Sequence, residues 1–226
     1  MESTNNQKHS VMQTFLTILS GLGWIIVYEE CIRLGFKQKT YAMPFFALGL
    51  NVAWEAVYTY SDIFLAAHGP LTGMTLVQTI ANAAWVCLDV VILTTWFLYG
   101  KRWFPKTVSH KWFAPWSILV LLTCFALQLV FIREFGFEMA AQYSAFLQNL
   151  LMSVLFIAMF VQRGSMEGQS LLLAFSKWIG TLAPTILMGV LIPDPLVLVT
   201  GLLCSVFDLI YIGLLISYRR NHEIRI

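Results

Sequence analysis

The sequence predicts an all-α polytopic membrane protein, a bundle of seven transmembrane helices that forms one domain over residues 1–226. The composition is the first indication: 58% of the residues are hydrophobic and 12% are charged, about half the charged fraction of a soluble domain. Second, seven apolar stretches each approach the roughly 20 residues that cross a bilayer as a helix. Third, the connections are short and contain glycine and proline, which leaves little chain for an extramembrane domain.

The seven stretches are expected, in chain order, at residues 12–32, 42–64, 73–99, 115–132, 139–162, 170–192 and 195–217. The first has full spanning length and lacks an A-x-A-like cleavage site, so we interpret it as an anchor rather than a cleaved signal. HGPLTG separates the second stretch from the third, and GKRWFPKTVSHKW separates the third from the fourth. RGSMEGQS precedes the sixth stretch and IPDP precedes the seventh, so each connection has the turn residues that end a helix.

The basic residues predict the orientation. The loops after the first, third and fifth stretches and the tail after the seventh carry eleven Lys and Arg, whereas the opposite side carries only Lys8 and Arg133. Because basic loops remain in the cytosol, the N-terminus is expected to be lumenal or exterior and the C-terminus cytosolic. The net charge of +2 comes from these loops and so indicates topology, not a nucleic-acid surface.

Polar side chains recur on one face of several stretches, at helical steps of three and four. The second stretch carries Asn51, Glu55, Tyr58 and Asp62, with Trp54 adjoining, and the third carries Gln78, Asn82, Trp85 and Asp89. The seventh carries Asp208 and Tyr211. Such faces favour convergence on an interior pocket, although Asn and Gln in membrane helices often only bond a neighbouring helix.

The acidic residues carry the functional hypothesis. Glu55 and Asp208 are expected near the middle of their stretches, where an ionisable group costs several kcal/mol and usually serves function. Asp89 is expected nearer the cytosolic end of the third stretch. Lys177 lies two turns into the sixth stretch, and we expect its side chain to extend back to the cytosolic interface.

No metal ion and no cofactor are expected. All four histidines lie in loops or tails, the four cysteines are scattered over different stretches, and no aspartate-rich run is present to hold magnesium ions on a diphosphate. The chain also lacks a glycine-rich phosphate loop, and the seventh stretch lacks a lysine for a Schiff base. Carboxyl groups and aromatic rings without a metal favour acid chemistry on an apolar substrate.

Four segments resemble the small integral-membrane terpene cyclases of meroterpenoid and indole-diterpene biosynthesis. They are GLGWIIVYEE, KTYAMPFFALGLNVAWEAVY, RGSMEGQS and SVFDLIYIGL, and they contain an N-x-x-W-E motif at 51–55 and a D-x-x-Y motif at 208–211. The resemblance extends over essentially the whole chain. It implies seven transmembrane helices, no metal, and cyclisation of a prenylated substrate started by protonation, often at a terminal epoxide. The two essential acids of that family correspond to Glu55 and Asp208.

The expected mechanism follows from these residues. A desolvated acid pair retains a proton, which Glu55 or Asp208 can give to an epoxide or, less easily, to an alkene, and aromatic rings stabilise the resulting cations. The residues expected to bind the substrate are Asn51, Trp54, Tyr58, Trp85, Asp89, Phe207 and Tyr211. We expect the second and seventh stretches to face one shared apolar cavity that both carboxyl groups line. The expected partners are a prenylated, epoxidised small molecule and the lipid bilayer, with no nucleic acid; the sequence indicates no oligomeric state.

One alternative stays open at this stage. A seven-helix transporter or receptor could use the same buried acids to bind a cation or to relay protons. The first, fourth and sixth stretches contain few polar residues, which argues against a continuous polar pathway.

Overall fold

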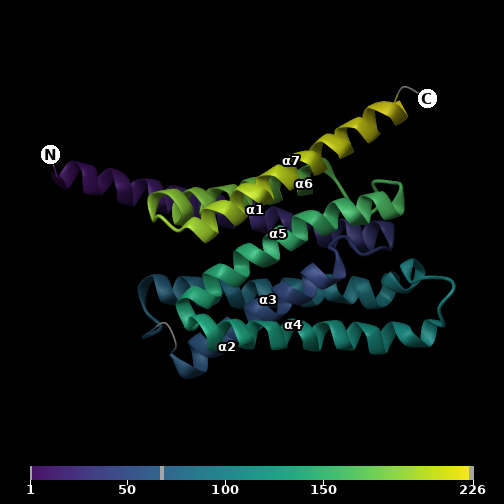
Figure 1. Cartoon of the computed structure of the whole chain (residues 1–226), viewed down its shortest axis with the longest axis horizontal. Helices are drawn as coiled ribbons and strands as arrows, with labels where there is room; N and C mark the ends of the chain where they lie inside the picture. Colours follow the sequence, from purple (N-terminus) through teal and green to yellow (C-terminus); the bar gives the residue numbers. More distant parts are fainter. Residues whose placement is uncertain (1, 67–68, 224–226) are drawn as a thin grey trace.

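A computed structural model describes residues 2–66 and 69–223, and this part of the chain is helical, without strands (Figure 1). The helices are α1 (Glu2–Gln38), α2 (Phe45–Leu65), α3 (Gly73–Tyr99), α4 (Phe113–Phe135), α5 (Phe137–Arg163), α6 (Leu171–Thr185) and α7 (Pro195–Glu223). Two 3-10 turns, η1 (Gly100–Trp103) and η2 (His110–Trp112), lie between α3 and α4. A π-helical segment, η3 (Ile186–Leu191), continues α6 after Pro184, whose missing N–H disrupts regular helical bonding.

Six of the seven α-helices, counted over the described residues and with α6 taken together with η3, are long and apolar enough to cross a membrane. The exception is α2, so the expectation of seven spanning helices is confirmed only in its coarser form, a multi-pass helical membrane protein. Over a membrane-spanning length, α2 is less apolar than the other helices because it carries Asn51, Glu55 and Asp62, and these side chains are all buried within the protein. By contrast, α4 exposes a row of large apolar side chains that includes Leu119, Leu122 and Leu129, a surface suited to lipid.

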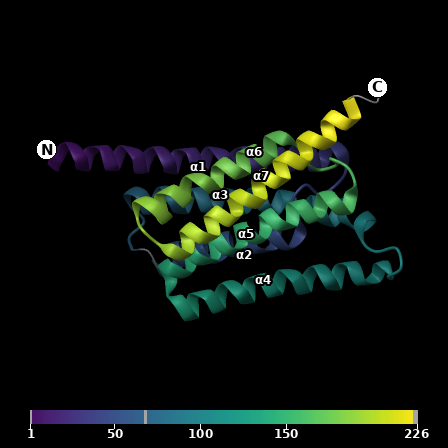
Figure 2. The same cartoon turned by 45° about the horizontal axis from the view of Figure 1, so that its top comes forward.

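The helices pack in a closed ring. Each helix contacts two neighbours in the order α1, α3, α2, α4, α5, α7, α6 and back to α1, and α2 also touches α5. Figures 1 and 2 show α4 on the side of the bundle away from α1. Buried side chains that link two non-adjacent helices of this ring therefore meet in its interior.

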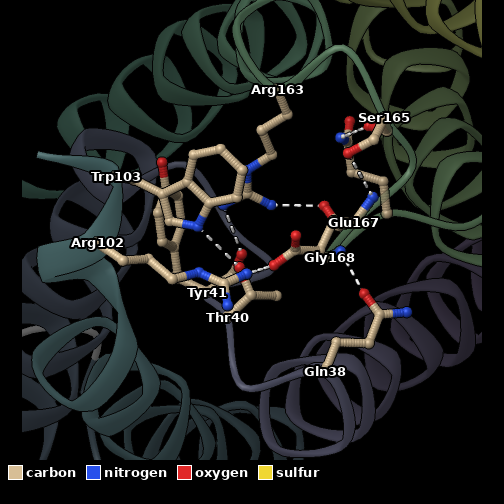
Figure 3. Close-up of polar contacts among 10 residues, drawn as sticks. Gln38, Thr40, Tyr41, Arg102, Trp103, Arg163, Ser165, Glu167 and Gly168 are labelled. Carbon is tan, nitrogen blue, oxygen red and sulfur yellow. Dashed lines mark hydrogen bonds and ion pairs between the residues drawn. The ribbon is translucent and has the colours of Figure 1, made fainter.

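The two termini lie at opposite ends of the bundle (Figure 1). The loops after α1, α3 and α5 meet at one end, where Figure 3 shows their contacts. Arg163 donates to the backbone oxygens of Tyr41 and Glu167, at 2.9 and 2.6 Å, and its guanidinium lies over the rings of Tyr41 and Trp103. The Trp103 indole in turn donates to the Thr40 hydroxyl. One arginine thus ties together the three loops that carry the basic residues.

Lys39 ends α1 in a left-handed conformation, with φ of 52°. The N–H of Thr40 donates to the Gly35 oxygen at 3.0 Å, and the N–H of Lys39 donates to the Phe36 oxygen at 3.4 Å. These two bonds form a Schellman motif, in which glycine is the preferred residue at the position of Lys39.

Lys39→Gly is therefore expected to raise the free energy of unfolding by about 1 kcal/mol, because it removes the steric cost of a Cβ in this conformation. Thermal unfolding of the detergent-purified protein measures the change. The control is Lys37→Gly in the last helical turn, which should lower stability by about 1 kcal/mol because φ is helical there. A loss of stability in both variants would contradict the assignment of the motif.

Candidate active site

Glu55 lies near the middle of α2 with 5% of its surface exposed, on the interior side of the ring. The Tyr28 hydroxyl of α1 donates a hydrogen bond to Glu55 Oε1. Because α3 separates α1 from α2 in the ring, this bond between buried side chains crosses the interior. Glu55 Oε2 receives no hydrogen bond from the described residues. Glu55 Oε1 is therefore fixed by the Tyr28 hydroxyl, and Glu55 Oε2 can bond a group other than these residues.

A directed chain of hydrogen bonds ends at Glu55. The amide of Gln128 donates to Gln148 at 3.2 Å, Gln148 donates to Asn51 at 3.2 Å, and Asn51 donates to the Tyr28 hydroxyl at 3.5 Å. The chain links α4, α5, α2 and α1, and every member is buried. Because each group donates toward Glu55, the chain fixes both the rotamer of Tyr28 and the side of Glu55 that it contacts.

Asp89 of α3 is the nearest acidic partner of Glu55 in this site. Its side chain is fully buried, and neither carboxyl oxygen receives a hydrogen bond from a donor among the described residues. The carboxyl groups of Glu55 and Asp89 are neighbours in the ring interior, close enough to interact electrostatically. Since an ionised carboxylate only accepts hydrogen bonds, a bond between Glu55 and Asp89 requires a proton on one of them. The structure thus pairs Glu55 with Asp89, which the sequence placed only as a substrate contact.

Asp208 belongs to a second buried cluster, formed by residues of α5, α6 and α7. Lys177 Nζ of α6 lies 2.8 and 3.0 Å from the two Asp208 oxygens and 2.7 Å from the Ser153 hydroxyl of α5. Lys177 is fully buried and Asp208 is 1% exposed. The expectation that Lys177 extends to the interface is therefore wrong: its rotational position on α6 directs it into the ring, where a carboxylate compensates its charge.

The two predicted acids therefore do not pair with each other. Glu55 is grouped with residues of α1 and α3, and Asp208 with residues of α5 and α6. α2 and α7 are not neighbours in the ring, so Glu55 and Asp208 have different hydrogen-bond partners, and the cavity that both carboxyl groups are expected to line stays a prediction.

The predicted aromatic residues divide between these regions. Trp85 stacks on Tyr28, with ring centroids 6.4 Å apart and planes inclined by 14°, so it lies next to the Glu55 cluster. Trp54 donates to the Ala141 oxygen at 2.9 Å and contacts Tyr58, which packs on α5.

The aromatic residues of α7 lie elsewhere. Phe207 is half-buried beside Asp208 in the chain. Tyr211 donates to Gln169 at 2.9 Å and packs on Phe156.

Sequence reasoning missed four residues of these clusters: Tyr28, Gln128, Gln148 and the inward-facing Lys177. Each lies in or beside an apolar run, where a polar side chain in a membrane helix equally suits the interface or the lipid boundary. The YEE sequence at 28–30 within the resembling segment was the one available signal for Tyr28. Among the described residues, no three His, Cys, Asp or Glu side chains gather closely enough to hold a metal ion together.

The fold and the site define a class: a multi-pass helical membrane protein with carboxyl groups buried in the interior of its helix ring. The family model of Pyr4-like transmembrane terpene cyclases matches residues 3–221, and the chain belongs to this family. Membership makes it a terpene cyclase and disfavours the transporter or receptor alternative.

Curated relatives are also terpene cyclases. The chain is 26% identical to terpene cyclase pyr4 of Aspergillus fumigatus over 91% of this chain and 86% of the relative. It is 26% identical to the Pyr4-family terpene cyclase mfmH of Annulohypoxylon moriforme, over 75% of this chain and 67% of the relative. It is 30% identical to terpene cyclase penB of Penicillium crustosum, over 71% and 63% of the two chains. No solved structure matches the chain.

Proposed function

We propose that this terpene cyclase starts the cyclisation of a prenylated substrate by protonating a terminal epoxide, or less easily an alkene, without a metal ion. The observation that carries the proposal is the arrangement at Glu55: Tyr28 donates to one carboxyl oxygen, the second oxygen receives no hydrogen bond from the described residues, and the buried carboxyl group of Asp89 is a neighbour. A proton shared by two buried carboxyl groups can be donated to a substrate oxygen that enters between them.

Each step uses residues of this chain. Glu55 gives its proton to the epoxide oxygen, the carbon–oxygen bond breaks, and the neighbouring double bond supplies the electrons that close the first ring. The last carbocation loses a proton to form a double bond, so the product is an isomer of the substrate. Trp85 and Tyr28 present stacked rings beside Glu55, and an aromatic face near a cation contributes about 2 kcal/mol when desolvated. Trp54 and Tyr58 are the proposed wall toward α5, and Phe207 and Tyr211 the proposed wall along α7. Asn51 acts through Tyr28, by positioning its hydroxyl.

Asp208 has a different proposed role from Glu55. A carboxylate that accepts two bonds from an ammonium group has no proton to give, so Asp208 is proposed to act as an ionised carboxylate that Lys177 holds in place in the ring interior. Such a charge can stabilise cationic intermediates that form far from Glu55. Glu55 is accordingly the proposed proton donor, and Asp208 the proposed electrostatic stabiliser.

The test is a product assay. Membranes containing the full chain are incubated with a panel of farnesyl- and geranylgeranyl-bearing acceptors, each with and without a terminal epoxide, and products are separated by mass and retention. We expect a cyclised isomer, with unchanged mass, from at least one epoxidised substrate. Conversion of the non-epoxidised substrates alone would contradict the epoxide trigger.

Cyclisation is expected to persist in EDTA and to need no added magnesium, because the sequence lacks an aspartate-rich diphosphate motif. The measurement is the initial rate of product formation with and without the chelator. Loss of activity on chelation, restored by a divalent ion, would instead make the Glu55–Asp89 pair a metal site.

We also propose that all seven α-helices, including α2, cross the membrane. α2 has 21 residues and a length of about 31 Å, enough to cross the hydrocarbon core, and the termini lie at opposite ends of the bundle. Both features support seven crossings.

We expect the N-terminus to be lumenal or exterior and the C-terminus cytosolic, because the basic loops share one end of the bundle. Protease treatment of sealed microsomes should remove a C-terminal tag and spare an N-terminal one. Protection of the C-terminal tag would reverse the orientation.

A further inference from the structure

An open cleft of about 510 Å³ is lined in part by Arg102, one of the residues drawn in Figure 3, and it shares no lining residue with either buried cluster. Its lining residues come from the end of α1, the last turn of α3, η1 and η2: Lys39, Leu98, Tyr99, Lys101, Arg102 and His110. The cleft is thus formed where two spanning helices leave the apolar part of the bundle.

The charge of the cleft is positive. Arg102 forms an ion pair with Glu167, which anchors one wall to the loop after α5. Lys39 and Lys101 have no carboxylate within ion-pair distance among the described residues, and both side chains are exposed. Two ammonium groups therefore remain available to an anion.

The same cleft has an apolar side. Leu98 is 57% exposed, and Tyr99 meets Phe36 edge to face with ring centroids 6.5 Å apart. Phe36 and Phe97 are themselves exposed. Exposed aromatic and aliphatic side chains next to basic ones are typical of the level at which lipid headgroups meet acyl chains.

The backbone adds an independent observation. Lys39 occupies the left-handed position that glycine would fill with less strain. A strained residue retained at a helix end suggests that its side chain has a role there.

We propose that this cleft binds the phosphate group of an anionic glycerophospholipid, with Lys39 and Lys101 as the cationic contacts and Leu98 beside the acyl chains. A free phosphate offers the same oxyanion, but it has no apolar part that could contact Leu98 and the other exposed apolar side chains. The site is separate from the cyclisation site and does not depend on the proposed mechanism.

Native mass spectrometry of the detergent-purified full chain tests the proposal, with phosphatidic acid and phosphatidylcholine as the probes. The wild type is expected to retain phosphatidic acid in preference to phosphatidylcholine. Each basic side chain at a lipid surface contributes about a fivefold increase in affinity for an anionic lipid. The double variant Lys39→Gly/Lys101→Gln should therefore weaken the binding of phosphatidic acid about twenty-fivefold. Glycine suits the backbone of residue 39, so this variant keeps its fold, which thermal unfolding checks.

The matched control is Lys106→Gln/Lys111→Gln, which removes the same charge from the same end of the protein but not from the cleft. It should bind phosphatidic acid as the wild type does. Equal losses in both double variants, or no preference for phosphatidic acid in the wild type, would overturn the proposal. Displacement of the lipid by an equal concentration of inorganic phosphate would overturn the assignment to a lipid.

Discussion

Glu55→Gln is expected to lower the rate of cyclisation by about a hundredfold to ten-thousandfold, the usual contribution of a general acid. The amide keeps the size of the side chain, and its oxygen can still accept the bond from Tyr28. What it loses is the proton that the proposed mechanism transfers. The measurement is the turnover of the preferred substrate in membranes, normalised to the amount of inserted protein.

The control for this variant is Asp62→Asn, the same chemical change on the same helix. Asp62 is also buried, but its carboxylate contacts Thr79 rather than the Glu55 cluster. It should accumulate like Glu55→Gln and retain most of the activity. Near-normal turnover of Glu55→Gln would rule out Glu55 as the proton donor.

Asp208→Asn is expected to destabilise the protein by about 3–5 kcal/mol, because it leaves the fully buried ammonium of Lys177 without a compensating charge. Lys177→Met should also be destabilising, since it leaves the Asp208 carboxylate unpaired. The double variant Lys177→Met/Asp208→Asn should recover much of the loss, because no unpaired charge remains and Ser153 keeps its bond to the Asn149 oxygen. Unfolding of the three purified variants in detergent measures this coupling.

The double variant also separates the structural role of Asp208 from its proposed electrostatic one. If Asp208 stabilises cationic intermediates, the double variant folds but cyclises slowly. Restored stability together with restored activity would show that Asp208 serves only to compensate Lys177. A single Asp208→Asn variant as stable as the wild type would contradict the ion pair itself.

The helices were largely predictable from the sequence. The third stretch, expected at 73–99, is α3 at Gly73–Tyr99, and the fifth, expected at 139–162, is α5 at Phe137–Arg163. Long apolar runs between turn residues predict helices, because a chain in lipid must satisfy every backbone hydrogen bond within its own segment. The first stretch was predicted too short, since hydrophobicity does not report that α1 continues through polar residues at both ends.

The sequence by itself determined that Glu55 and Asp208 are buried and cannot face lipid, because an acid within an apolar run is too costly there. Only the tertiary structure decided their partners: Tyr28 and Asp89 for Glu55, and Lys177 for Asp208. Helical periodicity shows which residues of one helix share a face, but not which helices are neighbours or how each is rotated about its axis. The direction of Lys177, inward to an acid rather than outward to the interface, depends on that rotation. This rotation is set by the packing of α6 against α1 and α7. The residues of α1 lie more than a hundred positions before those of α6 in the chain, so the local sequence of α6 does not reveal the contact.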